Sequence, residues 1–107
     1  MHILLIDDDP IWLRYLGVFL VQEGNTVTSV QTSHELEALL PSQWDLILID
    51  WHLWGCMGAT ALETLAAKGE LKGRVAFLSA NDTPPPEAKE LMKKFNAYWI
   101  LKAPGNV

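Results

Sequence analysis

The chain has 107 residues, of which half are hydrophobic and a fifth are charged. This composition predicts a single folded domain over residues 1–107 and excludes an intrinsically disordered chain. The formal net charge of −5, without any Lys/Arg cluster, argues against direct nucleic-acid binding. The lone Cys56 cannot form an internal disulfide, and no apolar run reaches the ~20 residues of a membrane span. We therefore expect a soluble, cytoplasmic protein without a membrane partner.

The first predicted elements are a strand and a long helix. Residues 2–6 form a short apolar run that ends in three acids, which is typical of a buried strand leading into a loop. Asp9 is a suitable N-cap, and Pro10 suits the first helical position. We expect a helix from there to about Glu23, ended by a left-handed residue at Gly24.

The second strand and second helix are predicted at residues 26–30 and after Thr32. Thr32 and Glu35 have the spacing of a capping box. Three leucines are expected on one face of this helix: Leu36, Leu39 and Leu40. The run at residues 46–49 is the strongest strand signal in the chain, and it ends at Asp50.

The second half of the chain continues the alternation. We predict a helix over residues 58–68, stopped by Gly69, and a fourth strand over 75–78. The proline-rich stretch at 81–86 predicts a loop before a fourth helix. The apolar face of that helix carries Ala88, Leu91, Met92 and Phe95. A fifth strand is predicted over 98–101. Strands alternating with helices indicate an α/β fold with a five-stranded parallel sheet covered on both faces.

Polar side chains follow four of the predicted strands. They are Asp7, Asp8 and Asp9 after the first strand, Asp50 after the third, Ser79 after the fourth and Lys102 after the fifth. The carboxyl ends of parallel strands lie along one edge, where such sheets bind ligands. Clustered carboxylates suit Mg²⁺, and one carboxylate can act as the nucleophile toward a phosphoryl group. A metal ion, a lysine ammonium and a hydroxyl would contact the phosphoryl oxygens. The constellation predicts phosphoryl transfer to Asp50.

The segments MHILLIDDDP, DLILIDWHLWGCMG and VAFLSA, with the strand that ends at Lys102, resemble the receiver domains of two-component response regulators. The resemblance covers essentially the whole chain. It implies a doubly wound, flavodoxin-like sheet with strand order 2-1-3-4-5. It also implies that Asp50 is the phosphoacceptor and that a histidine kinase or phosphotransfer protein is the donor. The metal would be Mg²⁺, bound by Asp8, Asp50 and the backbone carbonyl of His52, with Asp7 acting largely through water.

The resemblance also assigns roles around the acceptor. Ser79 and Lys102 stand at the family's phosphoryl-binding positions, and Trp99 stands at the position of its aromatic switch residue. Phosphorylation would draw Ser79 inward and let Trp99 change rotamer, which alters a protein-binding surface on the fourth helix and fifth strand. His52 and Asn81 would tune dephosphorylation. Such a domain is a signalling module rather than an enzyme.

Three departures from the family pattern stand out. Trp54 replaces the usual proline of the loop after the acceptor, and the family's Lys-Pro step is here interrupted by Ala103. The chain ends at Val107, where a receiver normally continues into a fifth helix. The helix around residues 11–21 is apolar almost all round, which is typical of a helix buried on more than one side. We therefore expect a homodimer, or another partner, to cover this helix, and the alternative is that the sequence is part of a longer regulator.

Two other functions remain open from the sequence. A haloacid-dehalogenase-like phosphatase would use Asp7 as nucleophile, with Asp9, Ser79 and Lys102 completing its site. Such enzymes are normally longer and need a further acidic group after the lysine, which this chain lacks. A receiver-like module that binds partners without being phosphorylated is the second alternative.

Overall fold

The computed structural model describes residues 1–53 and 56–102. Within them, the strands are β1 (His2–Ile6), β2 (Thr26–Val30), β3 (Leu46–Asp50), β4 (His52–Leu53), β5 (Cys56–Met57), β6 (Arg74–Ser79) and β7 (Tyr98–Leu101). The α-helices are α1 (Pro10–Gln22), α2 (Ser33–Glu37), α3 (Gly58–Ala66) and α4 (Pro86–Phe95), and a short 3-10 helix spans Pro41–Gln43.

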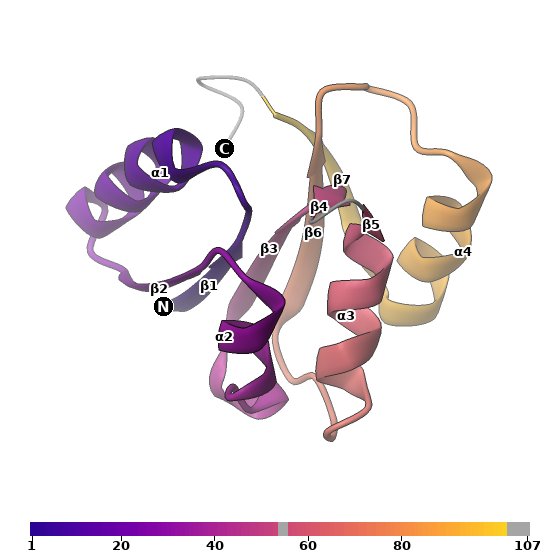
Figure 1. The fold of residues 1–107 in the computed structure, drawn as a ribbon, viewed down its shortest axis with the longest axis horizontal. Coiled ribbons are helices and arrows are strands. Elements are labelled where there is room, and N and C mark those ends of the chain that lie inside the picture. Colours follow the sequence, from indigo (N-terminus) through magenta and orange to yellow (C-terminus); the bar gives the residue numbers. More distant parts are fainter. Residues whose placement is uncertain (54–55, 103–107) are drawn as a thin grey trace.

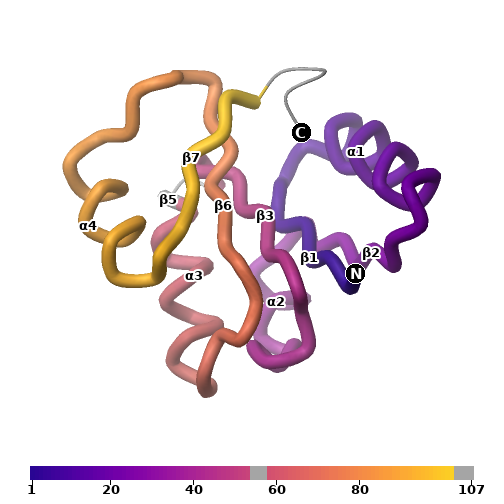
Figure 2. The backbone as a smooth tube through the Cα atoms, turned by 180° about the vertical axis from the view of Figure 1, so that it is seen from behind, coloured from indigo at the N-terminus to yellow at the C-terminus, as the bar shows by residue number. Residues whose placement is uncertain are grey.

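Five of the strands form one parallel sheet in the order β2-β1-β3-β6-β7. Without the short β4 and β5, this is the predicted order 2-1-3-4-5, and the flavodoxin-like prediction is confirmed. Among the described elements, α1 alone covers one side of the sheet, whereas α2, α3 and α4 cover the other (Figure 1). The view from behind gives the same arrangement (Figure 2).

Two hydrophobic cores lie on the two faces of the sheet. The core under α2, α3 and α4 includes Leu4, Ile47, Ile49, Leu62 and Phe77, all fully buried. The core under α1 includes Ile3, Leu5, Leu13, Leu16 and Leu48. The central strands are thus buried on both faces, which explains why their sequences are continuous apolar runs rather than alternating ones.

The first helix begins and ends as predicted. The Asp9 side chain accepts hydrogen bonds from the backbone N–H groups of Ile11 and Trp12, and Pro10 occupies the first turn. At the other end, Gly24 has φ +92°, a left-handed conformation that residues with a Cβ rarely adopt. These caps fix where α1 starts relative to the acids that follow β1.

The second helix is shorter than predicted. Thr32 caps it, and the Glu35 carboxylate accepts from the backbone of Gln31, one residue before the N-cap. The helix ends at Glu37, and Leu40 is extended and 56% exposed. The prediction that Leu40 shares one helix face with Leu36 and Leu39 is therefore wrong, because Pro41 disfavours the helical conformation of the residue before it.

Smaller differences occur around the acceptor loop and at α3. The helix α3 ends at Ala66 rather than at residue 68. The antiparallel pair β4–β5 was not predicted, since strands of two residues are too short to produce a periodic pattern. The departures at Trp54, at Ala103 and beyond it lie outside the described residues.

Much of the outer surface of α1 is apolar and exposed. Ile11 is 79% exposed and Val18 is 52% exposed, while Leu13 and Leu16 on the opposite side are buried against the sheet. No helix follows β7 in the part of the chain that the structure describes. None of the described helices has the length and apolar character needed to cross a membrane.

Candidate functional site

Strand register brings the predicted site residues to one edge of the sheet. Ile6 of β1 pairs with Ile49 of β3, so Asp7 emerges next to Asp50. On the other side of β3, Asp50 pairs with Leu78 of β6, and Ser79 pairs with Leu101 of β7. The residues that follow these pairs therefore meet at the carboxyl edge, as the sequence predicts.

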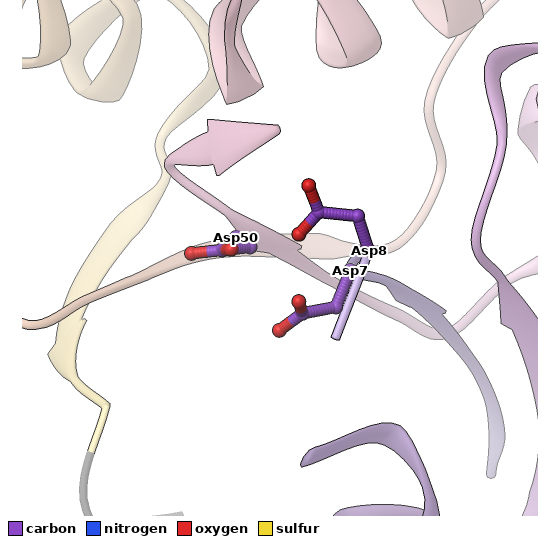
Figure 3. Close-up of side chains that lie close together, drawn as sticks. All are labelled: Asp7, Asp8 and Asp50. Carbon is purple, nitrogen blue, oxygen red and sulfur yellow. The ribbon is translucent and has the colours of Figure 1, made fainter. Parts of the chain in front are cut away.

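Three carboxylates converge at this edge. Asp7, Asp8 and Asp50 each place one carboxylate oxygen within 4.8 Å of the others. Their side chains extend from the tips of β1 and β3 toward a common space (Figure 3). Asp7 and Asp50 are buried, and Asp8 is exposed. Three negative charges at this separation repel one another, so positive charge nearby stabilises the cluster.

Lys102 supplies part of that positive charge. Its Nζ lies 2.7 Å from Asp7 Oδ2 and 3.5 Å from Asp50 Oδ2. Burial by itself would lower the pKa of the Lys102 ammonium, but the contacts with Asp7 and Asp50 outweigh burial and raise the pKa. The ammonium therefore stays charged and serves as a counter-ion within the acidic cluster.

At Asp50, in contrast to Lys102, burial outweighs the contacts and disfavours the charged form. Burial, followed by repulsion from Asp7, raises its pKa from 3.8 to about 6, although Lys102 and a backbone hydrogen bond from His52 lower it. A buried carboxylate with incomplete charge compensation favours anything positive that approaches it.

Asp9 has a different task from its two neighbours. Its backbone N–H donates to Asp7 Oδ1 at 2.9 Å, and its carboxylate caps α1. Asp9 is thus not among the three clustered carboxylates, but it holds the Asp7 side chain in place. The run of three acids divides into two cluster members and one cap.

Gly58 allows α3 to start close to the acceptor. A Cβ at this position would lie 2.5 Å from the backbone oxygen of Asp50 and 3.1 Å from the Cα of Trp51. The Gly58 N–H also donates to the Trp51 carbonyl at 2.5 Å. A larger residue would push α3 away from the end of β3.

The remaining predicted residues line a neighbouring pocket of about 540 Å³. Its walls include His52, Ser79, Asn81 and Trp99. The Ser79 hydroxyl oxygen accepts a hydrogen bond from the Asn81 N–H at 3.1 Å. The hydroxyl is the acceptor in this bond, and its own hydrogen takes no part in it. The Trp99 indole N–H donates to the Asn81 carbonyl at 2.9 Å. The structure therefore brings these four residues together beside the acceptor.

Two tryptophans at the site were missed by sequence reasoning. Trp51 is buried directly after Asp50, and its ring meets those of Phe77 at 5.1 Å and Trp99 at 5.5 Å. The ring centroid of Trp12 lies 5.3 Å from Lys102 Nζ. Trp51 could have been noticed from its position beside the acceptor, whereas Trp12 is one apolar residue among many in α1.

Comparison with known proteins agrees with this geometry. A model of the response regulator receiver domain matches residues 3–104. Protein PetR of Rhodobacter capsulatus is 31% identical over 112 residues, which cover 90% of this chain and 47% of PetR, so the chain spans about half the length of this relative.

Solved structures give the same result. The non-phosphorylated HemR receiver domain of Leptospira biflexa is 25% identical, with a TM-score of 0.78 over 94% of this chain and 81% of that one. The response regulator TrrA of Thermotoga maritima, solved in complex with Mg²⁺-BeF, is 19% identical, with a TM-score of 0.72 over 97% and 88% of the two chains. The chain therefore belongs to the response regulator receiver domain family.

Proposed function

We propose that residues 1–107 act as a phosphoacceptor in a two-component phosphorelay, in which Asp50 receives a phosphoryl group from a histidine kinase or phosphotransfer protein. The observation that carries this proposal is the meeting of Asp7, Asp8 and Asp50 within 4.8 Å, with Lys102 Nζ 3.5 Å from Asp50. This set combines a nucleophile, a metal-binding group and a fixed positive charge.

The transfer itself is a displacement at phosphorus. An oxygen of the Asp50 carboxylate forms the new O–P bond, the N–P bond of the donor phosphohistidine breaks, and the imidazole nitrogen leaves with the electron pair. The Lys102 ammonium offsets negative charge on the phosphoryl oxygens throughout. The product is an acyl phosphate on Asp50.

The acidic cluster fits Mg²⁺. Carboxylate oxygens are the hard ligands this ion prefers, and the buried charge on Asp7 and Asp50 is only partly balanced by Lys102. Asp8, Asp50 and the His52 backbone carbonyl would hold the ion directly, with Asp7 acting largely through water. When bound, Mg²⁺ would neutralise the carboxylates and polarise the phosphoryl group. The binding of Mg²⁺-BeF by TrrA supports this assignment.

The switch residues then read the new charge. The Ser79 side chain would move toward the phosphoryl group, and its hydroxyl would donate to a phosphoryl oxygen. This movement would disturb the hydrogen bond that the Ser79 hydroxyl oxygen accepts from the Asn81 N–H. Since Trp99 is held by the Asn81 carbonyl, the same movement would release Trp99 toward a new rotamer. His52 and Asn81 line the pocket beside Asp50, where their side chains would tune the access of water.

The output is a protein interaction rather than catalysis. We propose that a cytoplasmic partner binds α4 and β7 according to the state of Trp99. A second copy of the chain is proposed to cover α1, because Ile11, Tyr15 and Val18 form an exposed, mainly apolar surface on it, beside Arg14.

Intact-mass measurement tests the phosphoacceptor role. Purified protein is treated with phosphoramidate and Mg²⁺. The wild type is expected to gain the mass of a phosphoryl group, and Asp7→Asn is expected to gain the same mass more slowly. Asp50→Asn should gain no mass. If Asp50→Asn is still modified and Asp7→Asn is not, the nucleophile is Asp7 and the phosphatase alternative is correct. If the wild type gains no mass, the domain signals without phosphorylation.

A further inference from the structure

We propose that Trp12 is a positioning residue for Lys102, and that its indole face holds the Lys102 ammonium at the acidic cluster, within reach of a phosphoryl group on Asp50. This inference rests on the proposed function, because it concerns the rate at which Asp50 is phosphorylated. Trp12 lies in the first turn of α1, on a different element from every clustered group.

The Lys102 side chain needs a third contact to stay between its two carboxylates. Its backbone is fixed, since the Lys102 N–H donates to the Ser79 carbonyl at 2.6 Å, but its four-carbon stem is flexible. Asp7 at 2.7 Å would draw the ammonium away from Asp50 at 3.5 Å. The Trp12 ring, centred 5.3 Å from Nζ, attracts the cation within the ~6 Å range of such contacts. The Lys102 side chain is only 17% exposed, so water screens this attraction weakly.

Trp12 is itself positioned by the acids that follow β1. The Trp12 backbone N–H donates to Asp9 Oδ1 at 3.4 Å, and the Asp9 N–H donates to Asp7 Oδ1 at 2.9 Å. The other oxygen of Asp7 contacts Lys102, which faces the Trp12 ring. These contacts form a closed circuit that begins and ends at Asp7.

The ring is held by packing and not by its N–H group. It lies 5.6 Å from the Tyr15 ring at 35° and packs against the core under α1. The indole Nε1 is buried without a hydrogen-bond partner in the described part of the chain. A leucine would fill apolar space without burying this N–H, so the contribution specific to an aromatic residue is its face toward Lys102.

Variants that separate the aromatic face from apolar bulk test the proposal. The rate of Asp50 phosphorylation by phosphoramidate at saturating Mg²⁺ is followed by intact mass. Trp12→Leu is expected to slow it by roughly 2- to 30-fold, the range that corresponds to loss of a cation–π contact. Trp12→Phe keeps an aromatic face and should stay close to the wild-type rate. Phe19→Leu makes the same kind of change on an exposed part of α1 and should leave the rate unchanged.

NMR chemical shifts of the wild-type protein report on the contact between Trp12 and Lys102 directly, and a purely structural role of Trp12 would not change them. The methylene protons next to Lys102 Nζ should be shifted upfield by the Trp12 ring current, and Trp12→Leu should abolish this shift. Random-coil positions for these protons, a wild-type rate for Trp12→Leu, or a Trp12→Phe variant as slow as Trp12→Leu would each overturn the proposal. Absence of phosphorylation in the wild type would instead overturn the proposed function, and the ring-current shift would still report on the contact.

Discussion

At the scale of single residues, Asp50 is held in a state that costs stability. Its carboxylate is buried beside Asp7, and Lys102 contacts Asp7 more closely than Asp50. The pKa of Asp50 is therefore raised to about 6. Because the folded state binds this proton more tightly than the unfolded state, ionisation of Asp50 weakens folding as pH rises from about 4 to about 6.

Asp50→Asn is predicted to stabilise the metal-free protein at pH 7.5. Asparagine removes the buried charge, so the free energy of unfolding should increase by about 1–2 kcal/mol. The increase is smaller than the free energy that corresponds to the whole shift of the Asp50 pKa, because the contacts of the Asp50 carboxylate with Lys102 are also lost. Urea unfolding with a chelator present, at pH 4, 6 and 7.5, measures the difference between the two proteins. The difference should shrink as pH falls and Asp50 becomes protonated. An equal difference at all three pH values would contradict the raised pKa.

The sequence predicted which residues meet at the site but not how their side chains pair. Parallel topology alone places Asp7, Asp50 and Lys102 at one edge. Which carboxylate lies nearer Lys102 depends on the path of a flexible side chain, and this path depends on Trp12. No local pattern marks a contact between residues so far apart in the chain.

At the scale of elements, a lysine that follows α3 bonds the backbone at the end of α2. Lys68, just after α3, donates from Nζ to the backbone carbonyls of Leu36, Glu37 and Leu39. These carbonyls lie at the C-terminal end of the five-residue helix α2 and just beyond it, and the Leu36 carbonyl also accepts from the Leu39 N–H. The positive charge also suits the negative end of the helix.

Lys68→Met is predicted to destabilise the domain. The substitution keeps the apolar stem but removes the donors, and the free energy of unfolding should fall by about 1 kcal/mol, since the group is partly exposed to solvent. Urea unfolding measures the change, and hydrogen exchange should show faster opening of α2. Lys72→Met, at an exposed lysine nearby, is the matched control. Equal effects of the two substitutions would show that the carbonyl contacts contribute nothing.

The long elements were predictable and the short ones were not. The strands and α1 follow from apolar runs and caps such as Asp9 and Gly24. The β4–β5 pair depends on a contact between two segments of two residues each. Such contacts leave no periodic signal within a window of a few residues.

At the scale of the whole molecule, the two sides of the sheet are unequally covered. Among the described elements, α1 lies alone on its side (Figure 1). A groove of about 730 Å³ runs along its outer surface. Ile11, Tyr15 and Val18 line this groove. A surface of this kind is typical of an interaction site.

The proposed association through α1 predicts a concentration-dependent dimer. Light scattering of the wild type should show a mass that rises with concentration toward twice the monomer mass. Val18→Glu should remain monomeric, because dimerisation would bury the charge of the glutamate in the interface. Thr60→Glu adds the same charge on α3, across the sheet, and should still dimerise. A wild type that stays monomeric at high concentration would exclude the second copy as the partner of this surface.

The central claim is that Asp50 carries the phosphoryl group, and chemical trapping tests it most directly. Borohydride reduces an aspartyl acyl phosphate to homoserine, so peptide mapping of the phosphorylated, reduced protein identifies the modified residue. We predict homoserine at position 50 and unmodified aspartate at positions 7 and 8. Homoserine at position 7, or a phosphoryl group on a residue outside the acidic cluster, would contradict the account.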